Sequence, residues 1–307
     1  MAHVSLSHET LKFRLILGLI LNAGIIIIEF LGGLWINSVG IMSDAGHNFI
    51  DQGALALTFY AHVVAVKPAT EERTFGYHRA GIIAALINGS MLLVAAAILG
   101  YVALGRITSP VAVPGGWVIL IAFVSFVANL TVALLFQESA KEDLNMRGAF
   151  WHMLMDAWVS LGVVGCGVVM LFVDMPVLDP LVSLIIVGVM IKGAWPLFRE
   201  SLDILLESAP PGIQTRQVIA AIEQIDGVQN VHDFHIWALK PRLIMLTCHV
   251  ITEQEGLHLT QKLLATIRAK MAEQFGINHL TIQLETGCAH QQTRHCDLNH
   301  STADAPP

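Results

Sequence analysis

Charged side chains are scarce in this sequence. Lysine, arginine, aspartate and glutamate together make up 13% of its 307 residues, whereas hydrophobic residues make up 54%. A soluble globular domain has about 25% charged residues, so this composition excludes an ordinary soluble protein. The sequence therefore predicts a protein that has most of its length inside a membrane.

The sequence also lacks an excess of basic residues and is poor in cysteine. It has 17 lysines and arginines against 24 aspartates and glutamates, and this net charge of -7 gives no support to nucleic-acid binding, which needs a basic face. Of its four cysteines, Cys166 lies in an apolar run, and Cys248, Cys288 and Cys296 lie in a region that we assign to the reducing cytoplasm. We predict no structural disulfide.

Six apolar runs are each near or above the roughly 20 residues that cross a bilayer as a helix. They are Leu15–Trp35, Val39–Val66, Ala80–Leu104, Trp117–Phe136, Gly148–Val173 and Val177–Leu197. The first run is too long for the core of a signal peptide and has no cleavage site after it, so we keep it as a span. The prediction is a polytopic α-helical membrane protein with six transmembrane helices in residues 15–200, after an N-terminal segment of residues 1–14.

The lysines and arginines of the short loops predict the orientation of this bundle. One side of the membrane would hold Lys12, Arg14, Lys67, Arg73, Arg79, Lys141, Arg147, Lys192 and Arg199, and the other side only Arg106. By the positive-inside rule both termini are cytoplasmic, and membrane lipid surrounds the spans.

From Ser201 onward the sequence has the residue pattern of a soluble domain. A helical pattern at 215–225 is followed by two β-branched runs around the Pro241-Arg242 turn, an amphipathic helix at 258–275 and a last strand at 279–285. This αββαβ order predicts a small cytoplasmic α+β domain of the ferredoxin-like type over residues 201–287. Residues 288–307 are predicted to be a flexible tail that contains Cys and His.

Two polar pairs interrupt the apolar runs with the same spacing. His47 precedes Asp51 by four residues, and His152 precedes Asp156 by four, so each pair lies on one face of its helix. Asp44 lies on the same face as His47. A carboxylate at the centre of a membrane costs about 2.5 to 3.5 kcal/mol on insertion scales, so these residues need a compensating role. Two imidazoles and two carboxylates from facing helices would form a tetrahedral Zn²⁺ site.

A purely structural role is the alternative, because polar side chains in bundles commonly bond to neighbouring helices. Helix adhesion does not require the same spacing twice, so we favour the metal site. One difficulty is depth: counted from the outer ends of their runs, His47 lies shallower than His152. Tilted helices or a protruding fifth helix would be needed to level them.

Four segments together resemble the cation diffusion facilitator family, in particular its zinc-transporting bacterial branch. They are "SDAGHNFIDQGALAL", "FGYHRAGIIAALIN", "NMRGAFWHMLMDAWVSLGVV" and "NVHDFHIW". The resemblance implies a homodimer in the bacterial inner membrane that exports Zn²⁺ from the cytoplasm in exchange for protons. It also implies that His47, Asp51, His152 and Asp156 form the transport site. Other members of this family transport cadmium, cobalt, iron or manganese.

The resemblance further implies a regulatory zinc site in the soluble domain. His232, His249 and Glu285 match its ligand positions, whereas Gln283 stands where some members have a histidine. It also implies an ion pair between Arg79 and Glu207, beside the connection to the soluble domain. Four tail residues could bind metal as well, or could be ordinary solvated side chains: Cys288, His290, His295 and Cys296.

Two other functional classes use similar residues. An intramembrane metalloenzyme would need an open coordination position and a general base, but the sequence has no HExxH motif and four protein ligands would close the site. A metal sensor would leave the six-span bundle without a purpose. We therefore predict a secondary transporter, a metal/proton antiporter, rather than an enzyme.

Overall fold

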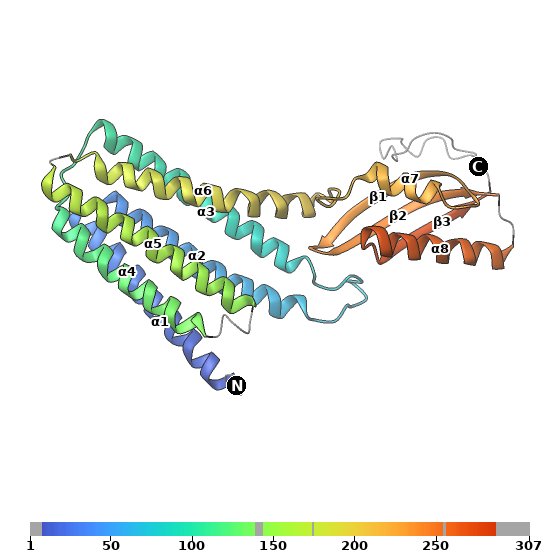
Figure 1. The fold of residues 1–307 in the computed structure, drawn as a ribbon, viewed down its shortest axis with the longest axis horizontal. Coiled ribbons are helices and arrows are strands. Elements are labelled where there is room, and N and C mark those ends of the chain that lie inside the picture. Colours follow the sequence, from blue (N-terminus) through green and yellow to red (C-terminus); the bar gives the residue numbers. More distant parts are fainter. Residues whose placement is uncertain (1–7, 139–143, 174, 254–255, 287–307) are drawn as a thin grey trace. The chain divides into compact units, whose positions relative to one another are not determined.

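The computed structural model describes residues 8–138, 144–173, 175–253 and 256–286 (Figure 1). Six long helices come first: α1 His8–Ile36, α2 Val39–Ala65, α3 Ala80–Thr108, α4 Gly115–Gln137, α5 Leu144–Phe172 and α6 Leu178–Leu205. The chain divides into two compact units. The first holds most of these helices, and the second holds His62–Ile83 and the chain from Arg199 onward.

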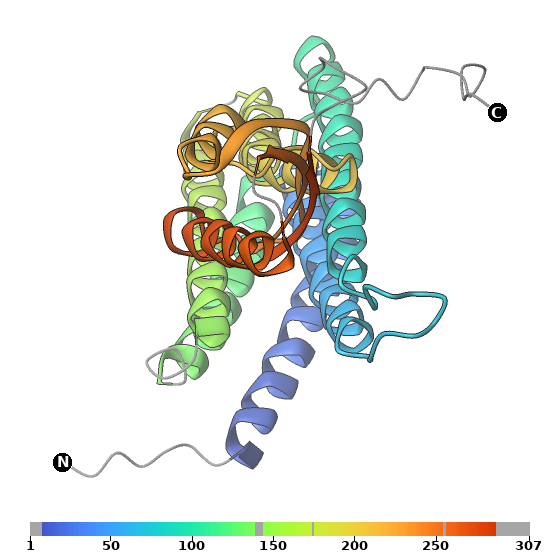
Figure 2. The same cartoon turned by 90° about the vertical axis from the view of Figure 1, so that its right-hand side faces the viewer.

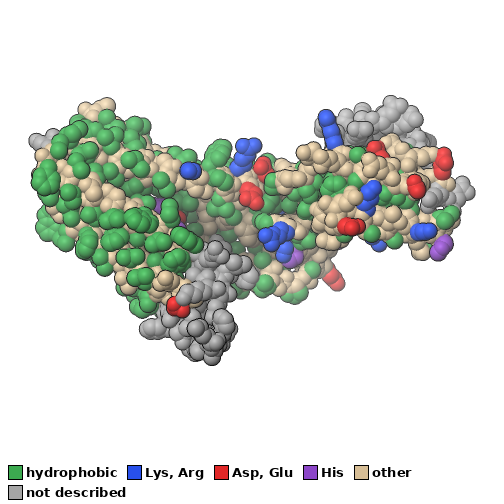
Figure 3. All heavy atoms as spheres, in the orientation of Figure 1, with side chains coloured by type: hydrophobic (Ala, Val, Ile, Leu, Met, Phe, Trp, Pro, Cys, Tyr) green, Lys and Arg blue, Asp and Glu red, His purple; other side chains and the backbone are tan. Residues whose placement is uncertain are grey.

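Five of the six helices are long and apolar enough to cross a membrane. These stretches are Ile16–Ile36, Ala80–Thr108, Gly115–Gln137, Phe150–Phe172 and Leu178–Leu205. Large hydrophobic side chains such as Ile20, Tyr101 and Phe172 are exposed on this unit, and hydrophobic atoms cover its visible surface in Figure 3. A surface of this kind suits contact with lipid rather than water. The prediction of a helical membrane domain is confirmed.

The helix α2 is continuous over 27 residues but is not among the five apolar candidates in the described chain. Asp44, His47, Asn48, Asp51 and Gln52 lower its hydropathy. The prediction of a sixth span therefore depends on what these polar residues do.

The helices α4 and α5 pack at very short range where both have glycine. A Cβ atom added to Gly115 would lie 2.9 Å from the carbonyl oxygen of Gly167, and one added to Gly167 would lie 2.8 Å from Cγ1 of Ile119. A larger side chain at either position would push the helices apart. This close contact fixes α5, which carries His152 and Asp156, against α4.

The C-terminal domain has the predicted αββαβ order. Its elements are α7 Thr215–Glu223, β1 Val228–Lys240, β2 Leu243–Thr252, α8 Leu257–Phe275 and β3 His279–Glu285. The sheet order is β1-β2-β3, with β1 and β2 antiparallel and β2 and β3 parallel. Figure 2 shows α7 and α8 on one face of this sheet.

Buried apolar residues alternate with less buried ones along the strands, and the buried ones form the core of this domain on the sheet face that the helices cover. Leu246, Cys248 and Val250 of β2 are buried against Ile222 of α7 and Ile267 of α8. Burial raises the pKa of the Cys248 thiol to about 12, so this cysteine is an inert core residue at neutral pH. The intervening residues of β2, including His249, therefore point to the opposite face.

Candidate metal sites

The two predicted His and Asp pairs meet between α2 and α5. Nε2 of His152 lies 3.2 Å from Oδ2 of Asp51, and Nε2 of His47 lies 3.9 Å from Oδ1 of Asp156. Within each helix the histidine and aspartate are 3.6 Å apart. All four side chains thus converge on one place, although their helices are separated by about a hundred residues of sequence.

The atoms at this meeting point are poorly satisfied by the protein itself. Nδ1 of His47 and Oδ2 of Asp156 are buried and have no hydrogen-bond partner within the described residues. Buried polar atoms are nearly always paired, so unpaired ones mark a place for a ligand. Two imidazoles and two carboxylates form a nitrogen and oxygen donor set that fits Zn²⁺ in a tetrahedron.

The expected difference in depth does not separate the two pairs. The contacts of His152 with Asp51 and of His47 with Asp156 place them side by side. The two pairs therefore lie level with each other, the arrangement for which the sequence analysis required tilted helices or a protruding fifth helix. Asp44 is buried one turn before His47, where its Oδ2 accepts a hydrogen bond from Oγ of Ser160 at 3.2 Å.

The N-terminus of α2 is fixed by a carboxylate from α6. The backbone N–H of Val39 donates to Oδ2 of Asp179 at 2.8 Å, and the hydroxyl of Ser38 donates to the other oxygen. Further along, Oγ of Ser43 and Oγ of Ser183 are 2.5 Å apart. A carboxylate at a helix N-terminus satisfies free N–H groups and the helix dipole. These contacts set the position of the helix that carries His47.

A second cluster lies on the sheet face that α7 and α8 leave uncovered. His232 of β1, His249 of β2 and Gln283 of β3 are direct neighbours across the three strands. Nε2 of His232 and Nδ1 of His249 are each 3.0 Å from the carboxylate of Glu285. His232, His249 and Glu285 each offer one ligand atom within 4.8 Å of the others, so they can hold a metal ion together.

Gln283 orients the carboxylate of this cluster. Its side-chain amide donates to Oε1 of Glu285 at 2.8 Å. Burial would raise the pKa of Glu285, but the hydrogen bonds from Gln283 and His232 and the charges of the two histidines outweigh it, so the pKa lies below its ordinary value. Glu285 is therefore ionised and ready to bind a cation at neutral pH.

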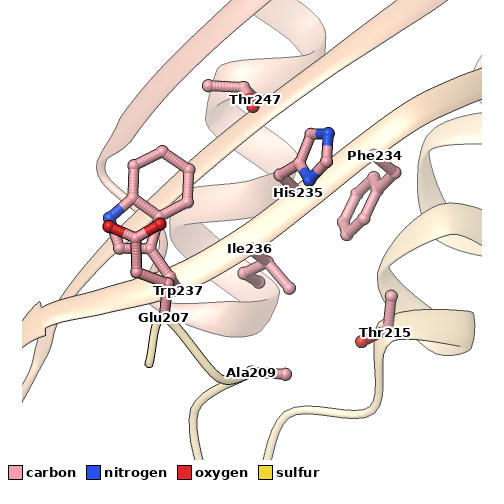
Figure 4. A pocket seen from close by; sticks show the side chains of 8 residues that line it. All are labelled: Glu207, Ala209, Thr215, Phe234, His235, Ile236, Trp237 and Thr247. Atoms are coloured by element: carbon pink, nitrogen blue, oxygen red, sulfur yellow. The ribbon is translucent and has the colours of Figure 1, made fainter. Parts of the chain in front are cut away.

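Sequence reasoning missed Asp233. Asp233 lies in the bulge of β1 between His232 and His235 with a φ of 46°, and its carboxylate is 3.5 Å from Nε2 of His249. Only its place next to His232 hints at this role. His235, on the other side of the bulge, is exposed and lines a pocket of about 410 Å³ (Figure 4).

The predicted ion pair of Arg79 and Glu207 is present. Nη2 of Arg79 lies 2.8 Å from Oε1 of Glu207, and both residues belong to the second compact unit. Glu207 has a φ of 58°, an uncommon conformation outside glycine, just after the end of α6. The four tail residues Cys288, His290, His295 and Cys296 lie outside the described residues.

Comparisons with known proteins cover both parts of the chain. Residues 15–206 match the cation efflux transmembrane domain, and residues 210–287 match the cytoplasmic domain of cation efflux proteins. The chain is 34% identical over 278 residues to the cadmium, cobalt and zinc/H⁺-K⁺ antiporter of Bacillus subtilis, covering 90% of this chain and 89% of that protein. It is 30% identical over 292 residues to the zinc transporter ZitB of Escherichia coli, covering 94% and 92%.

Among solved structures, the metal-bound C-terminal domain of the CzcD transporter from Cupriavidus metallidurans is similar to part of this chain. The match has 33% identity, covers 24% of this chain and 99% of that domain, and has a TM-score of 0.22.

Proposed function

We propose that this chain, which belongs to the cation efflux family of membrane transporters, exports Zn²⁺ from the cytoplasm in exchange for protons. The named relatives are transporters and antiporters and not enzymes, so the prediction of a transporter is confirmed and the metalloenzyme is set aside.

The convergence of His47, Asp51, His152 and Asp156 between α2 and α5 is the observation that supports it most strongly. In this proposal the four side chains coordinate Zn²⁺ during transport. The two carboxylates neutralise its two positive charges, which makes a dehydrated cation tolerable inside the bundle. The two imidazole nitrogens favour zinc over Mg²⁺ and Ca²⁺, which prefer oxygen ligands.

The same donor set explains exchange with protons. Zn²⁺ binds neutral imidazole and ionised carboxylate, so metal and protons compete for the same atoms. If the loaded and protonated forms favour opposite openings of the bundle, a proton gradient drives zinc outward by a shift of populations. To change the population ratio of the two openings from 1:99 to 99:1, zinc must bind one opening more tightly than the other by about 5.5 kcal/mol.

This transport role explains why α2 has polar residues, and we propose that α2 is the sixth span. Charged side chains inside membranes face the bundle and mark ion pathways. With six spans, the basic residues of the loops support our proposal, by the positive-inside rule, that both termini are cytoplasmic. A bacterial inner membrane is the location that fits this arrangement.

We further propose that the C-terminal domain binds regulatory Zn²⁺ through His232, His249 and Glu285 and pairs two copies of the chain as a homodimer. The spacing of the three ligand atoms supports the first point, and the match to the cytoplasmic domain model supports the second. Metal bound there would report cytoplasmic zinc to the transporter.

Flux into proteoliposomes with an imposed pH gradient tests the proposal. We expect uptake of Zn²⁺ that rises with the gradient and collapses when a protonophore removes it. Cadmium and cobalt, which appear in the name of the Bacillus relative, are the main competing substrates, followed by iron and manganese. Gradient-independent zinc movement would contradict antiport, and preferential flux of another metal would replace zinc as the substrate.

The substitution His47→Asp should change which metal is transported. It replaces a nitrogen ligand with a hard, shorter oxygen ligand, which relaxes the geometry that favours Zn²⁺. We expect the Zn²⁺ to Cd²⁺ flux ratio to fall by about tenfold, equivalent to about 1.4 kcal/mol of discrimination. His78→Asp, on the loop before α3, is the control. An unchanged ratio in a well-inserted His47→Asp variant would refute this role of His47.

Charge reversal at Arg79 should reduce transport, and a second reversal should restore part of it. An exposed ion pair contributes only about 0 to 1 kcal/mol of stability, so a large loss of flux would mean that the pair couples the soluble domain to transport. We expect about a fivefold loss in Arg79→Glu, within the factor of roughly 5 to 150 typical of coupling between sites. Adding Glu207→Arg should recover part of it. A double variant no better than Arg79→Glu alone would rule out the pair as the coupling contact.

A further inference from the structure

A second buried polar cluster lies beside the four residues of the transport site. Glu29 of α1 and Asp44 of α2 are 0% and 1% exposed. Asn48 of α2, Ser125 of α4 and Ser160 of α5 are also buried. The transport mechanism proposed above uses none of them, yet two carboxyl groups inside an apolar bundle are costly.

The hydrogen bonds of the two carboxyl groups leave one oxygen unpaired on each. Nδ2 of Asn48 donates to Oε2 of Glu29 at 3.1 Å, and Oγ of Ser160 donates to Oδ2 of Asp44 at 3.2 Å. Oε1 of Glu29 and Oδ1 of Asp44 are buried without a partner in the part of the chain that the structure describes. Asn48 lies one helical turn after Asp44 on α2, so the Glu29 carboxylate that it contacts lies on the same side of α2 as Asp44.

Two adjacent ionised carboxylates in a medium of low polarity would repel each other strongly, and each would lose its hydration there. A single proton on Glu29, donated to Asp44, would remove one charge and pair the two free oxygens. We propose that Glu29 and Asp44 form a proton-binding site that holds one shared proton when no metal is bound.

The place of Asp44 connects this site to the transport site. Asp44 lies one helical turn before His47 on α2, and Ser160, which donates to Asp44, lies one turn after Asp156 on α5. His47 and Asp156 therefore lie close to Asp44. A divalent cation held by His47 and Asp156 adds positive charge near Asp44, which favours the ionised pair and expels the shared proton. The inference deepens the proposed antiport: Glu29 supplies one exchanged proton from outside the metal ligands.

Infrared spectroscopy of the metal-free full-length protein in lipid nanodiscs at neutral pH tests the shared proton without any need for transport. We expect the wild type to show a protonated-carboxyl C=O band that disappears in Glu29→Gln. The same band should persist with a shifted frequency in Asp44→Asn, because Glu29 keeps its proton. The matched control is Glu200→Gln, an exposed glutamate on α6, which should leave the band unchanged. A band that is identical in wild type and Glu29→Gln would overturn the proposal.

Proton release on zinc binding tests the coupling. With a pH indicator in weak buffer, Glu29→Gln and Asp44→Asn should each release one proton fewer per zinc bound than the wild type. The double variant should also release one fewer, not two, because the two groups share a single proton. Equal release by all variants, or a loss of two in the double variant, would overturn the proposal. Gradient-independent zinc flux by the wild type would instead overturn antiport and leave the infrared result standing.

Discussion

Zinc flux should fall by more than about 100-fold in both Asp51→Ala and Asp156→Ala, because even outer-shell partners of metal ligands contribute 10- to 100-fold. Each substitution removes one ligand and one negative charge from the place where α2 and α5 meet. The remaining carboxylate would leave a bound Zn²⁺ with an uncompensated positive charge in the bundle, which is strongly unfavourable. Both variants should still insert, because neither side chain builds the apolar packing of the helices.

A matched control separates this effect from a general loss of carboxylate. Asp203→Ala removes an exposed aspartate of α6 that lies 3.9 Å from Arg199, and it should transport like the wild type. Asp156→Asn keeps the side-chain volume and loses only the charge, so it should fail like Asp156→Ala. Near wild-type flux from a folded Asp51 or Asp156 variant would remove these residues from the transport site.

The sequence was sufficient to find the residues at this meeting point because their signal is local. His47 and Asp51 are one helical turn apart, and so are His152 and Asp156, so their shared face follows from helix geometry alone. The same holds for the long apolar runs and for the strands of the C-terminal domain, whose alternation or apolar length is read from neighbouring residues. The family resemblance, rather than any pattern, supplied His232, His249 and Glu285 as a set.

Features that depend on distant contacts could not be predicted in the same way. The relative position of α2 and α5 decides that His152 meets Asp51 and that His47 meets Asp156, and no local pattern encodes this position. Glu29 and Asp44 belong to different helices, so no spacing along the sequence connects them. Asp233 reaches His249 because β1 has a bulge there, which the alternation pattern does not show.

The sheet register also explains how Gln283, at a position where some family members have a histidine, changes the cytoplasmic site. Gln283 is the β3 neighbour of His249, so a histidine there would be the third imidazole of one row across the sheet. In this chain its amide instead holds the carboxylate of Glu285, two residues along the same face of β3. The cluster therefore has two imidazoles and one carboxylate, which suits a single metal ion with an open fourth position.

Loss of one bound zinc per protomer is the expected result for His249→Ala. The measurement is equilibrium dialysis of the full-length protein in an Asp51→Ala background, where the transport site is disabled. The affinity of the cytoplasmic site should fall by at least about 100-fold, because a ligand contributes more than the outer-shell groups that cost 10- to 100-fold. The exposed His258→Ala is the control and should bind like its parent.

Lowering the pH should release the same zinc, because the ligands of this site also bind protons. The pKa of Glu285 lies below its ordinary value, so its carboxylate stays ionised at mildly acidic pH. Protons compete with a metal ion for nitrogen ligands, so zinc occupancy should decrease as the pH is lowered below 7. In Gln283→His, a third imidazole next to His249 should raise the affinity at pH 7 and make the loss on acidification steeper. Zinc binding that is unaffected by His249→Ala and flat across this pH range would place the cytoplasmic metal on other residues.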